Sequence, residues 1–224
     1  MSKSNTQAPT QKFRGISALL LAAGRSTRMG HFKPLLPFGN SSVIEKSIEH
    51  LQGAGVREIV VVLGHRAAEL KNHLQLLELG FAVNPDLESE MGASIACGIR
   101  RLDPDARAVL IALADHPAVS SELIVSLIRE WETGEKLVVP EFEGRGGHPV
   151  LIDLSFRDEL LNLDQESGLR SFFERHRQET RRLRVSCPFI ARDLDTWDDY
   201  QALHEEVFGV LPQIKTRTEQ ARKE

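Results

Sequence analysis

The sequence predicts an α/β fold in which a doubly wound, mainly parallel sheet lies between two layers of helices. Apolar segments at 16–21, 58–63 and 108–114 carry this prediction, because each is too short to span a membrane and too continuous for a half-buried strand. Helical patterns of apolar residues separate these segments. Strands that alternate with helices favour parallel pairing through right-handed crossovers, which gives three α/β/α layers.

The remaining elements are predicted from the spacing of apolar residues and from the capping, glycine and proline residues between them. Ser41 or Ser42 is expected to cap a helix that ends near Gly53 or Gly55, and Thr196 with Asp199 resembles the capping box of a last helix through Phe208. Between them we expect helices over 66–77, 91–102, 121–131, 156–163 and 169–176, strands at 81–83, 137–139, 149–152 and 183–185, and a glycine-rich loop over 141–147.

Length and composition indicate one soluble enzyme-sized domain. The 224 residues divide into a polar, mobile segment 1–14, a domain 15–208 and a charged tail 209–224. A net charge of −4 argues against nucleic acid or an anionic membrane as the main partner. No apolar run reaches the ~18 residues of a membrane helix, and Cys97 and Cys187 lack metal or redox spacing. We therefore expect a cytoplasmic protein with reduced thiols.

A phosphate-binding loop is predicted within Ile16–Leu36, ISALLLAAGRSTRMGHFKPLL. The strand ends in small residues, so a base or phosphate could lie against the backbone, and cations follow within ten residues. The sequence fits neither the dinucleotide motif nor the P-loop motif, and an ordinary turn with solvated basic residues is the alternative. The predicted nucleotide-binding residues are Leu21, Ala22, Ala23, Gly24, Arg25 and Gly30, with Arg28 and Lys33 as catalytic cations.

Carboxylates for a metal are predicted at two places. A triphosphate needs Mg²⁺, which takes one or two carboxylates together with phosphates and water. Asp115 directly follows the strand 108–114, and so lies at the sheet edge that carries the Gly24 loop. Asp193 or Asp195 could supply a second carboxylate, and the sequence does not separate the two. The alternatives are a turn aspartate before Pro117 and acids that match the start of a helix.

The loop resembles the L-x-A-G-x-x-x-R-M-G-x-x-K signature of the MobA-like nucleotidyltransferases, through Leu21, Ala23, Gly24, Arg28, Met29, Gly30 and Lys33. The resemblance implies a Rossmann-like nucleotidyltransferase fold. It also implies that Leu113–Pro117 corresponds to the family's G-D-x-P element, whose aspartate holds metal, although Ala114 and His116 depart from it. ARDLDTWDDY resembles the family's D-I-D-T-P-E-D segment, with Trp197 in place of proline.

The same resemblance suggests where base and acceptor bind. Gly92 and Ser94 correspond to positions that contact the nucleotide base, and a helix N-terminus fits these residues equally well. Gly147 and His148 lie in a segment like the family's G-H-P-V-L, on the acceptor side, where His148 could donate a hydrogen bond to an acceptor phosphate. Arg170 lies in a segment that only loosely matches D-x-G-A-R.

These residues favour in-line attack by an acceptor phosphate on the α-phosphorus of a nucleotide, with Mg²⁺ as the cofactor and pyrophosphate as the product. Within the family the sequence is most similar to the molybdenum cofactor cytidylyltransferases, which implies CTP, a molybdopterin acceptor and a client molybdoenzyme. Guanylyl transfer is the near alternative. A sugar- or alditol-phosphate nucleotidyltransferase and a non-catalytic cofactor chaperone for a molybdoenzyme are the more distant ones.

Overall fold

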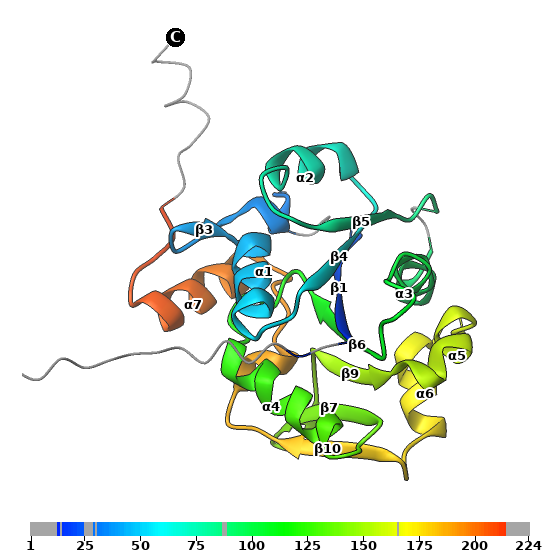
Figure 1. Ribbon diagram of the computed structural model, residues 1–224. Helices are drawn as coiled ribbons and strands as arrows, with labels where there is room; N and C mark the ends of the chain where they lie inside the picture. Colours follow the sequence, from blue (N-terminus) through cyan, green and yellow to red (C-terminus); the bar gives the residue numbers. More distant parts are fainter. Residues whose placement is uncertain are drawn as a thin grey trace, which may run out of the picture.

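The sheet lies at the centre of the molecule, with helices on both faces (Figure 1). The structure, a computed structural model, describes residues 13, 15–24, 29, 31–86, 89–164 and 166–213. Apart from Phe13, which is buried in the core, the predicted N-terminal segment lies outside these residues, as does most of the predicted tail. The strands run in the order β10 (Thr180–Arg184), β7 (Leu137–Phe142), β9 (Val150–Asp153), β6 (Ala108–Leu113), β1 (Ile16–Ala22), β4 (Glu58–Leu63) and β5 (Gly80–Val83).

The predicted mainly parallel, doubly wound sheet is confirmed. β1 pairs in parallel with both β4 and β6, and the pairs β4–β5 and β7–β10 are also parallel. β9 lies antiparallel between β6 and β7. Because Leu21 is opposite Leu113 and Ala22 is opposite Leu63, the carboxyl ends of β1, β4 and β6 meet at one edge.

Side chains of the central strand alternate between two cores. Ala18 and Leu20 of β1 pack in the core under α1 (Val43–Gly53), α2 (Ala67–His73) and α4 (Ser121–Glu132). Leu19 and Leu21 pack in the core under α3 (Met91–Ile99), α5 (Arg157–Leu161) and α6 (Gly168–Arg175). Figure 1 shows α3, α5 and α6 together on one side of the sheet and α1 and α4 on the other. A strand buried on both faces has to be apolar at every position, which explains the continuous runs.

A smaller third cluster holds the C-terminal helix against the start of the chain. α7 (Trp197–Phe208) begins at the predicted capping box, in which Thr196 and Asp199 bond each other reciprocally. Its Tyr200 is buried and donates a hydrogen bond to the carbonyl of Pro37 in the hairpin β2 (Pro37–Phe38) and β3 (Ser41–Ser42). This contact fixes the segment 187–195, with η3 (Pro188–Ala191), near the end of β6.

Several boundaries differ from the predicted ones. β7 continues to Phe142 and forms a hairpin with β8 (Arg145–Gly146), so the predicted loop over 141–147 is largely strand, turning at Glu143 and Gly144 with φ of 49° and 79°. β10 begins earlier than predicted, because backbone pairing with β7 decides the length of an exposed edge strand. The loop after β1 contains a short 3-10 helix, η1 (Lys33–Leu35). No helix in the described ranges is long and apolar enough to cross a membrane.

Candidate active site

The backbone after β1 is open to a ligand. Gly24 is exposed, and a Cβ built on it would meet no atom of the described residues within 4 Å. Gly64, which directly follows β4, packs against the backbone of Ala23. A Cβ on Gly64 would lie 2.8 Å from the carbonyl oxygen of Ala23, so this close approach requires glycine. The sequence pattern gave Gly64 no role beyond ending its strand.

The predicted nucleotide-binding residues divide into two groups. Leu21 and Ala22 are buried strand residues, and the carbonyl of Leu21 accepts a hydrogen bond of 3.0 Å from the backbone N–H of Ala114, so the sheet already uses it. Ala23 is partly exposed, as is Gly24 beside it. The remaining predicted residues of this loop, Arg25, Arg28 and Gly30, lie outside the described residues and stay predictions.

Lys33 connects the loop to the acidic half of the site. Its Nζ lies 2.9 Å from Oδ1 of Asp195 and 3.9 Å from Oδ2 of Asp115. The side chain of Lys33 is only 12% exposed, so a solvated loop lysine, the alternative raised by the sequence, is wrong. The structure therefore brings together three predicted residues from η1, the end of β6 and the start of α7.

The surroundings of Asp115 disfavour its charged form. Burial raises the pKa of its carboxyl group, while His116 and Lys33 lower it in part. A partly buried carboxylate that faces one lysine at 3.9 Å is incompletely compensated. A further cation at this position would stabilise the charged form of Asp115.

The structure gives Asp193 and Asp195 different partners. Asp195 faces Lys33, whereas Oδ1 of Asp193 accepts a hydrogen bond of 3.1 Å from Nε2 of His116. This hydrogen bond lowers the pKa of Asp193. The ring of His116 is buried, and its Nδ1 has no hydrogen-bond partner in the described part of the chain. His116 replaces the residue more usual in the family, and its pairing with Asp193 was not predicted.

The residues around Lys33 fit a divalent metal only when a nucleotide contributes. Among the residues that the structure describes, no group of three or more His, Cys, Asp or Glu side chains could hold a metal ion. Asp115 and Asp195 place two carboxylates around one cationic group, and Mg²⁺ is commonly held by one or two carboxylates plus substrate phosphates. The residues thus fit Mg²⁺ that arrives with a triphosphate.

His148 packs against His116, and a backbone hydrogen bond fixes its position. Its N–H donates a hydrogen bond of 2.7 Å to the carbonyl of Ile190 in η3. A Cβ on the preceding Gly147 would lie 2.1 Å from that same carbonyl oxygen, so this close approach requires glycine. The rings of His148 and His116 pack edge to face with centroids 6.2 Å apart.

The hydrogen bonds of His148 change its predicted role. Its Nδ1 lies 3.2 Å from the carbonyl oxygen of Ile111, and a carbonyl only accepts, so Nδ1 carries the proton. Burial lowers the pKa of His148 to about 4, which leaves the ring neutral at pH 7. Nε2 is then an acceptor. The predicted donation from His148 to an acceptor phosphate is therefore disfavoured, although contact with the acceptor stays a prediction.

The predicted base-binding residues are occupied by contacts within the protein. Ser94 is buried, and its Oγ accepts a hydrogen bond of 3.0 Å from Nδ2 of Asn84. Gly92 is covered by the α5–α6 connection, since its Cβ would lie 3.2 Å from the carbonyl oxygen of Asp164. Both residues shape the turn after β5, and direct contact with a base stays a prediction.

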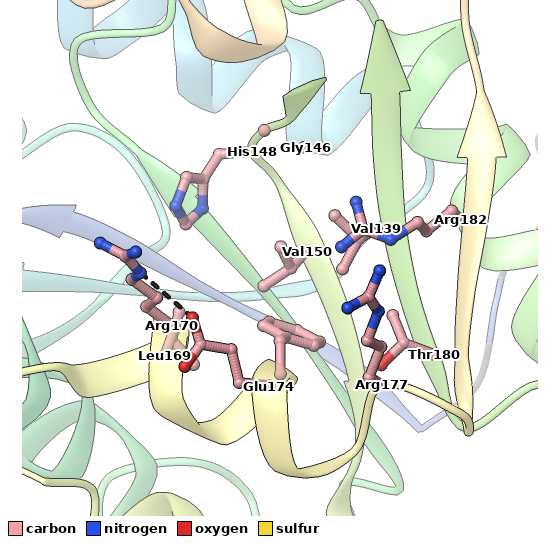
Figure 2. Close-up of a pocket in the computed structure, with 12 residues that line it drawn as sticks. Val139, Gly146, His148, Val150, Leu169, Arg170, Glu174, Arg177, Thr180 and Arg182 are labelled. Carbon is pink, nitrogen blue, oxygen red and sulfur yellow. Dashed lines mark hydrogen bonds and ion pairs between the residues drawn. The ribbon is translucent and has the colours of Figure 1, made fainter. Parts of the chain in front are cut away.

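A pocket of about 540 Å³ opens beside His148, between α6 and the ends of β7, β9 and β10 (Figure 2). Gly147, His148 and Arg170, the three predicted acceptor-binding residues, all line it. Arg170 is 85% exposed and pairs with Glu174 at 3.3 Å. The pocket also contains Arg177 and Arg182, which no motif in the sequence identified.

Comparison with known proteins identifies the family of this chain. Residues 18–180 match the family model described as the MobA-like NTP transferase domain. Nicotine blue oxidoreductase from Paenarthrobacter nicotinovorans is 29% identical over 195 residues, which cover 81% of this chain and 92% of that protein. The bifunctional protein GlmU from Exiguobacterium sibiricum is 31% identical over 128 residues, which are 54% of this chain but only 27% of GlmU.

Solved structures give the same result. Rv0371c from Mycobacterium tuberculosis H37Rv superposes with a TM-score of 0.76 at 28% identity, covering 85% of this chain and 98% of Rv0371c. A second structure of Rv0371c, described as a complex with manganese, has a TM-score of 0.73 at 28% identity, with the same coverage. The family model extends from β1 to the start of β10 and so includes Gly24, Lys33 and Asp115, but not Asp195. This chain is therefore a member of the MobA-like NTP transferase family.

Proposed function

We propose that this protein is a Mg²⁺-dependent cytidylyltransferase that transfers CMP from CTP to a phosphorylated acceptor such as molybdopterin. The observation that carries the proposal is the position of Lys33, whose Nζ lies 2.9 Å from the carboxylate of Asp195 and 3.9 Å from that of Asp115. A cation between two acids, in the segment that follows β1, suits the binding of a metal–triphosphate complex.

Asp115 and Asp195 would hold the metal. When bound, Mg²⁺ would neutralise phosphate charge and align donor and acceptor oxygens. The manganese described for Rv0371c supports a divalent metal in this family. The different partner of Asp193 favours Asp195 as the second ligand, with Asp193 holding His116 in place.

The reaction is a substitution at phosphorus. An oxygen of the acceptor phosphate forms a bond to the α-phosphorus of CTP, and the bond from that phosphorus to the oxygen bridging to the β-phosphate breaks. The electron pair leaves with pyrophosphate. Lys33, with Arg28 from the same loop, would neutralise the charge that develops on the leaving group, and the backbone at Gly24 would orient the phosphates.

The preference for CTP and for molybdopterin rests on the resemblance of LAAGRSTRMG and GHPVL to the cytidylyltransferases of the family. The protein would act in the cytoplasm and deliver its product to a client molybdoenzyme. Guanylyl transfer and transfer to sugar or alditol phosphates use the same residues around Lys33. They differ only in the base and acceptor contacts.

The test is a matrix of nucleotides against acceptors with pyrophosphate release as the readout. CTP, GTP, ATP and UTP would each be combined with molybdopterin, a sugar phosphate and an alditol phosphate, with Mg²⁺ or EDTA. We expect release with CTP and molybdopterin that EDTA abolishes. The absence of release from every combination would overturn the proposal and favour the cofactor chaperone.

A second candidate follows from the relative whose name describes an oxidoreductase and of which this chain covers 92% at 29% identity. An oxidoreductase could use the Gly24 loop to bind the pyrophosphate of a nicotinamide dinucleotide. Oxidation of NADH or NADPH, followed at 340 nm with a redox dye as electron acceptor, would detect this activity. The second candidate would be favoured by dye-dependent oxidation that Lys33→Met abolishes, together with no release of pyrophosphate from any combination of nucleotide and acceptor.

A further inference from the structure

The ammonium group of Lys33 faces the two carboxylates that are the candidate metal ligands. Its Nζ is 2.9 Å from Oδ1 of Asp195 and 3.9 Å from Oδ2 of Asp115. A second cation that contacted both acids would lie within a few ångströms of this ammonium group, where like charges repel strongly. In the nucleotide-free protein, Lys33 therefore takes the place that a metal shared by the two acids would need.

The backbone at Lys33 is anchored, whereas its side chain is long and flexible. Phe32 before it and Pro34 after it are buried. The carbonyl of Lys33 accepts a hydrogen bond of 3.1 Å from the N–H of Leu36, and the carbonyl of Phe32 accepts one of 3.0 Å from the N–H of Leu35. The lysine stem has four carbons that rotate about their own bonds. The ammonium group can therefore leave the carboxylates while η1 keeps its fold.

The two carboxylates are more accessible than the lysine that pairs with them. The side chain of Lys33 is 12% exposed, whereas those of Asp115 and Asp195 are 29% and 45% exposed. A cation from solution can therefore reach both acids without any opening of the fold. The ammonium group, by contrast, loses its partners when it leaves them, and a largely buried charge without a partner is costly. Lys33 should stay in place until other anionic oxygens are available to it.

A triphosphate supplies such oxygens. Its phosphate groups carry several negative charges, and lysine binds phosphate as a point charge. Lys33 lies in the segment that follows β1, which also carries the exposed Gly24. Transfer of the ammonium group from the carboxylates to the phosphates would free both acids when the nucleotide arrives. The freed acids and the phosphates together form the set of oxygen ligands that Mg²⁺ commonly takes.

We propose that Lys33 closes the metal site in the nucleotide-free protein and opens it when a triphosphate takes over its ammonium group. The divalent metal then binds where Lys33 was, at Asp115 and Asp195. One side chain thereby couples the binding of nucleotide and metal, and this coupling is reciprocal. The inference rests on the proposed function for the identity of the metal ligands. It adds that the metal alone binds weakly, because it would have to displace an ammonium group that has no other partner to go to.

Binding of Mn²⁺ in the absence of nucleotide tests the proposal without turnover. Mn²⁺ prefers the same oxygen ligands as Mg²⁺, and the electron paramagnetic resonance signal of the free ion falls as the ion binds. We expect Lys33→Met to bind Mn²⁺ about ten-fold more tightly than the wild type, because the competing charge is gone. Lys33→Gln, which keeps a polar tip, should show the same gain. Mn²⁺ alone should raise the Tm of both variants and leave that of the wild type almost unchanged.

Lys46→Met is the matched control, because Lys46 pairs with a different acid, Glu49 of the same helix, at 2.5 Å. It removes the same charge from the protein and should leave the affinity for Mn²⁺ unchanged. Addition of Asp195→Asn to Lys33→Met should remove the gain, because the gain depends on the freed carboxylate. CTP in the presence of EDTA should give a small rise in the Tm of the wild type and none in Lys33→Met, since Lys33 itself binds the phosphates.

Equal affinity for Mn²⁺ in the wild type and in both Lys33 variants would overturn the proposal. An equal gain in Lys46→Met, or a gain that survives Asp195→Asn, would overturn it as well. The two proposals fail in different experiments. A protein that shows the gain but releases no pyrophosphate refutes the nucleotidyl transfer and keeps the closed metal site. A protein that releases pyrophosphate with CTP, but whose Lys33 variants gain no affinity for Mn²⁺, refutes the closed site and keeps the transfer.

Discussion

Asp115 and Asp193 have different environments, although both belong to the candidate active site. Burial raises the pKa of Asp115, so its charged form is less favourable in the folded protein than in the unfolded chain. The hydrogen bond from His116 lowers the pKa of Asp193, so its charged form is favoured by folding. At neutral pH the two residues therefore have opposite effects on stability.

Asp115→Asn should separate function from stability. The amide removes a charge that burial disfavours, so we expect the free energy of unfolding to stay within about 0.5 kcal/mol of the wild type or to rise. Turnover should fall by roughly 100-fold or more, because a predicted metal ligand is lost. Urea unfolding and pyrophosphate release measure the two effects. Asp193→Asn, the control, should lower stability at pH 7, and a clear loss of stability in Asp115→Asn would indicate a structural aspartate.

His148 should make the protein acid-sensitive. Its pKa is about 4 in the folded protein against 6.5 ordinarily, so between these values the unfolded chain binds a proton that the folded protein does not. Stability therefore falls as the pH is lowered from 6.5 toward 4, by about 2 kcal/mol at pH 5. His148→Asn keeps a donor for the carbonyl of Ile111 and should lack this loss. Urea unfolding at pH 7 and pH 5 would show it, and an equal loss in both proteins would contradict the assignment.

At the scale of elements, the hairpin of β7 and β8 and the short helix η3 hold the acceptor side of the site together. Gly147 meets the carbonyl of Ile190 where no side chain fits, and the next residue bonds that carbonyl. This contact orients His148, which lies just before β9. The capping box of α7 fixes where the helix starts, and so it positions Asp195, which directly precedes the N-cap residue Thr196.

Gly147→Ala should therefore damage both packing and acceptor binding. Its Cβ would be 2.1 Å from a backbone oxygen, which cannot rotate away, so we expect a loss of about 2–3 kcal/mol in the free energy of unfolding and a raised KM for the acceptor. Gly144→Ala is the control in the same hairpin, with open space but a φ of 79°. It should cost only about 1 kcal/mol and leave KM unchanged. Similar KM values in the two variants would show that η3 does not position His148.

At the scale of the whole molecule, the site connects parts that are distant in sequence. The loop after β1, the end of β6 and the start of α7 meet around Lys33, so a nucleotide and metal bound there should stabilise the folded protein as a unit. A ligand at 100 times its Kd adds about 2.7 kcal/mol. For a chain of this size, that corresponds to a rise in Tm of roughly 5–10 °C.

CTP with Mg²⁺ should give this rise in a thermal melt. EDTA should remove most of it, and Asp115→Asn should reduce it in the same way, because both remove the metal contribution. GTP at the same concentration serves as the comparison for the base. An equal or larger rise with GTP would contradict the predicted preference for CTP.

Much of the fold could be predicted because its signals are local. Continuous apolar runs identified β1, β4 and β6, and capping residues identified the starts of α1 and α7. The edge strand β10 was partly missed, because its sequence TRRLR is polar and its pairing with β7 supplies the stabilisation. The hairpin at 141–146 was missed for the same reason, since cross-strand hydrogen bonds leave little trace in composition.

The sequence by itself determined the family and the parallel sheet, and it identified Lys33 and Asp115 as candidate site residues. It could do so because the motif residues lie within short segments at the carboxyl ends of neighbouring strands. Only the tertiary structure decided which acid faces Lys33, that His116 holds Asp193, that His148 accepts rather than donates at Nε2, and that Arg177 and Arg182 share a pocket with it. These depend on contacts between residues far apart in the chain. Spacing along a sequence carries no information on such distances, whereas packing of α6, α7 and η3 against the sheet fixes them.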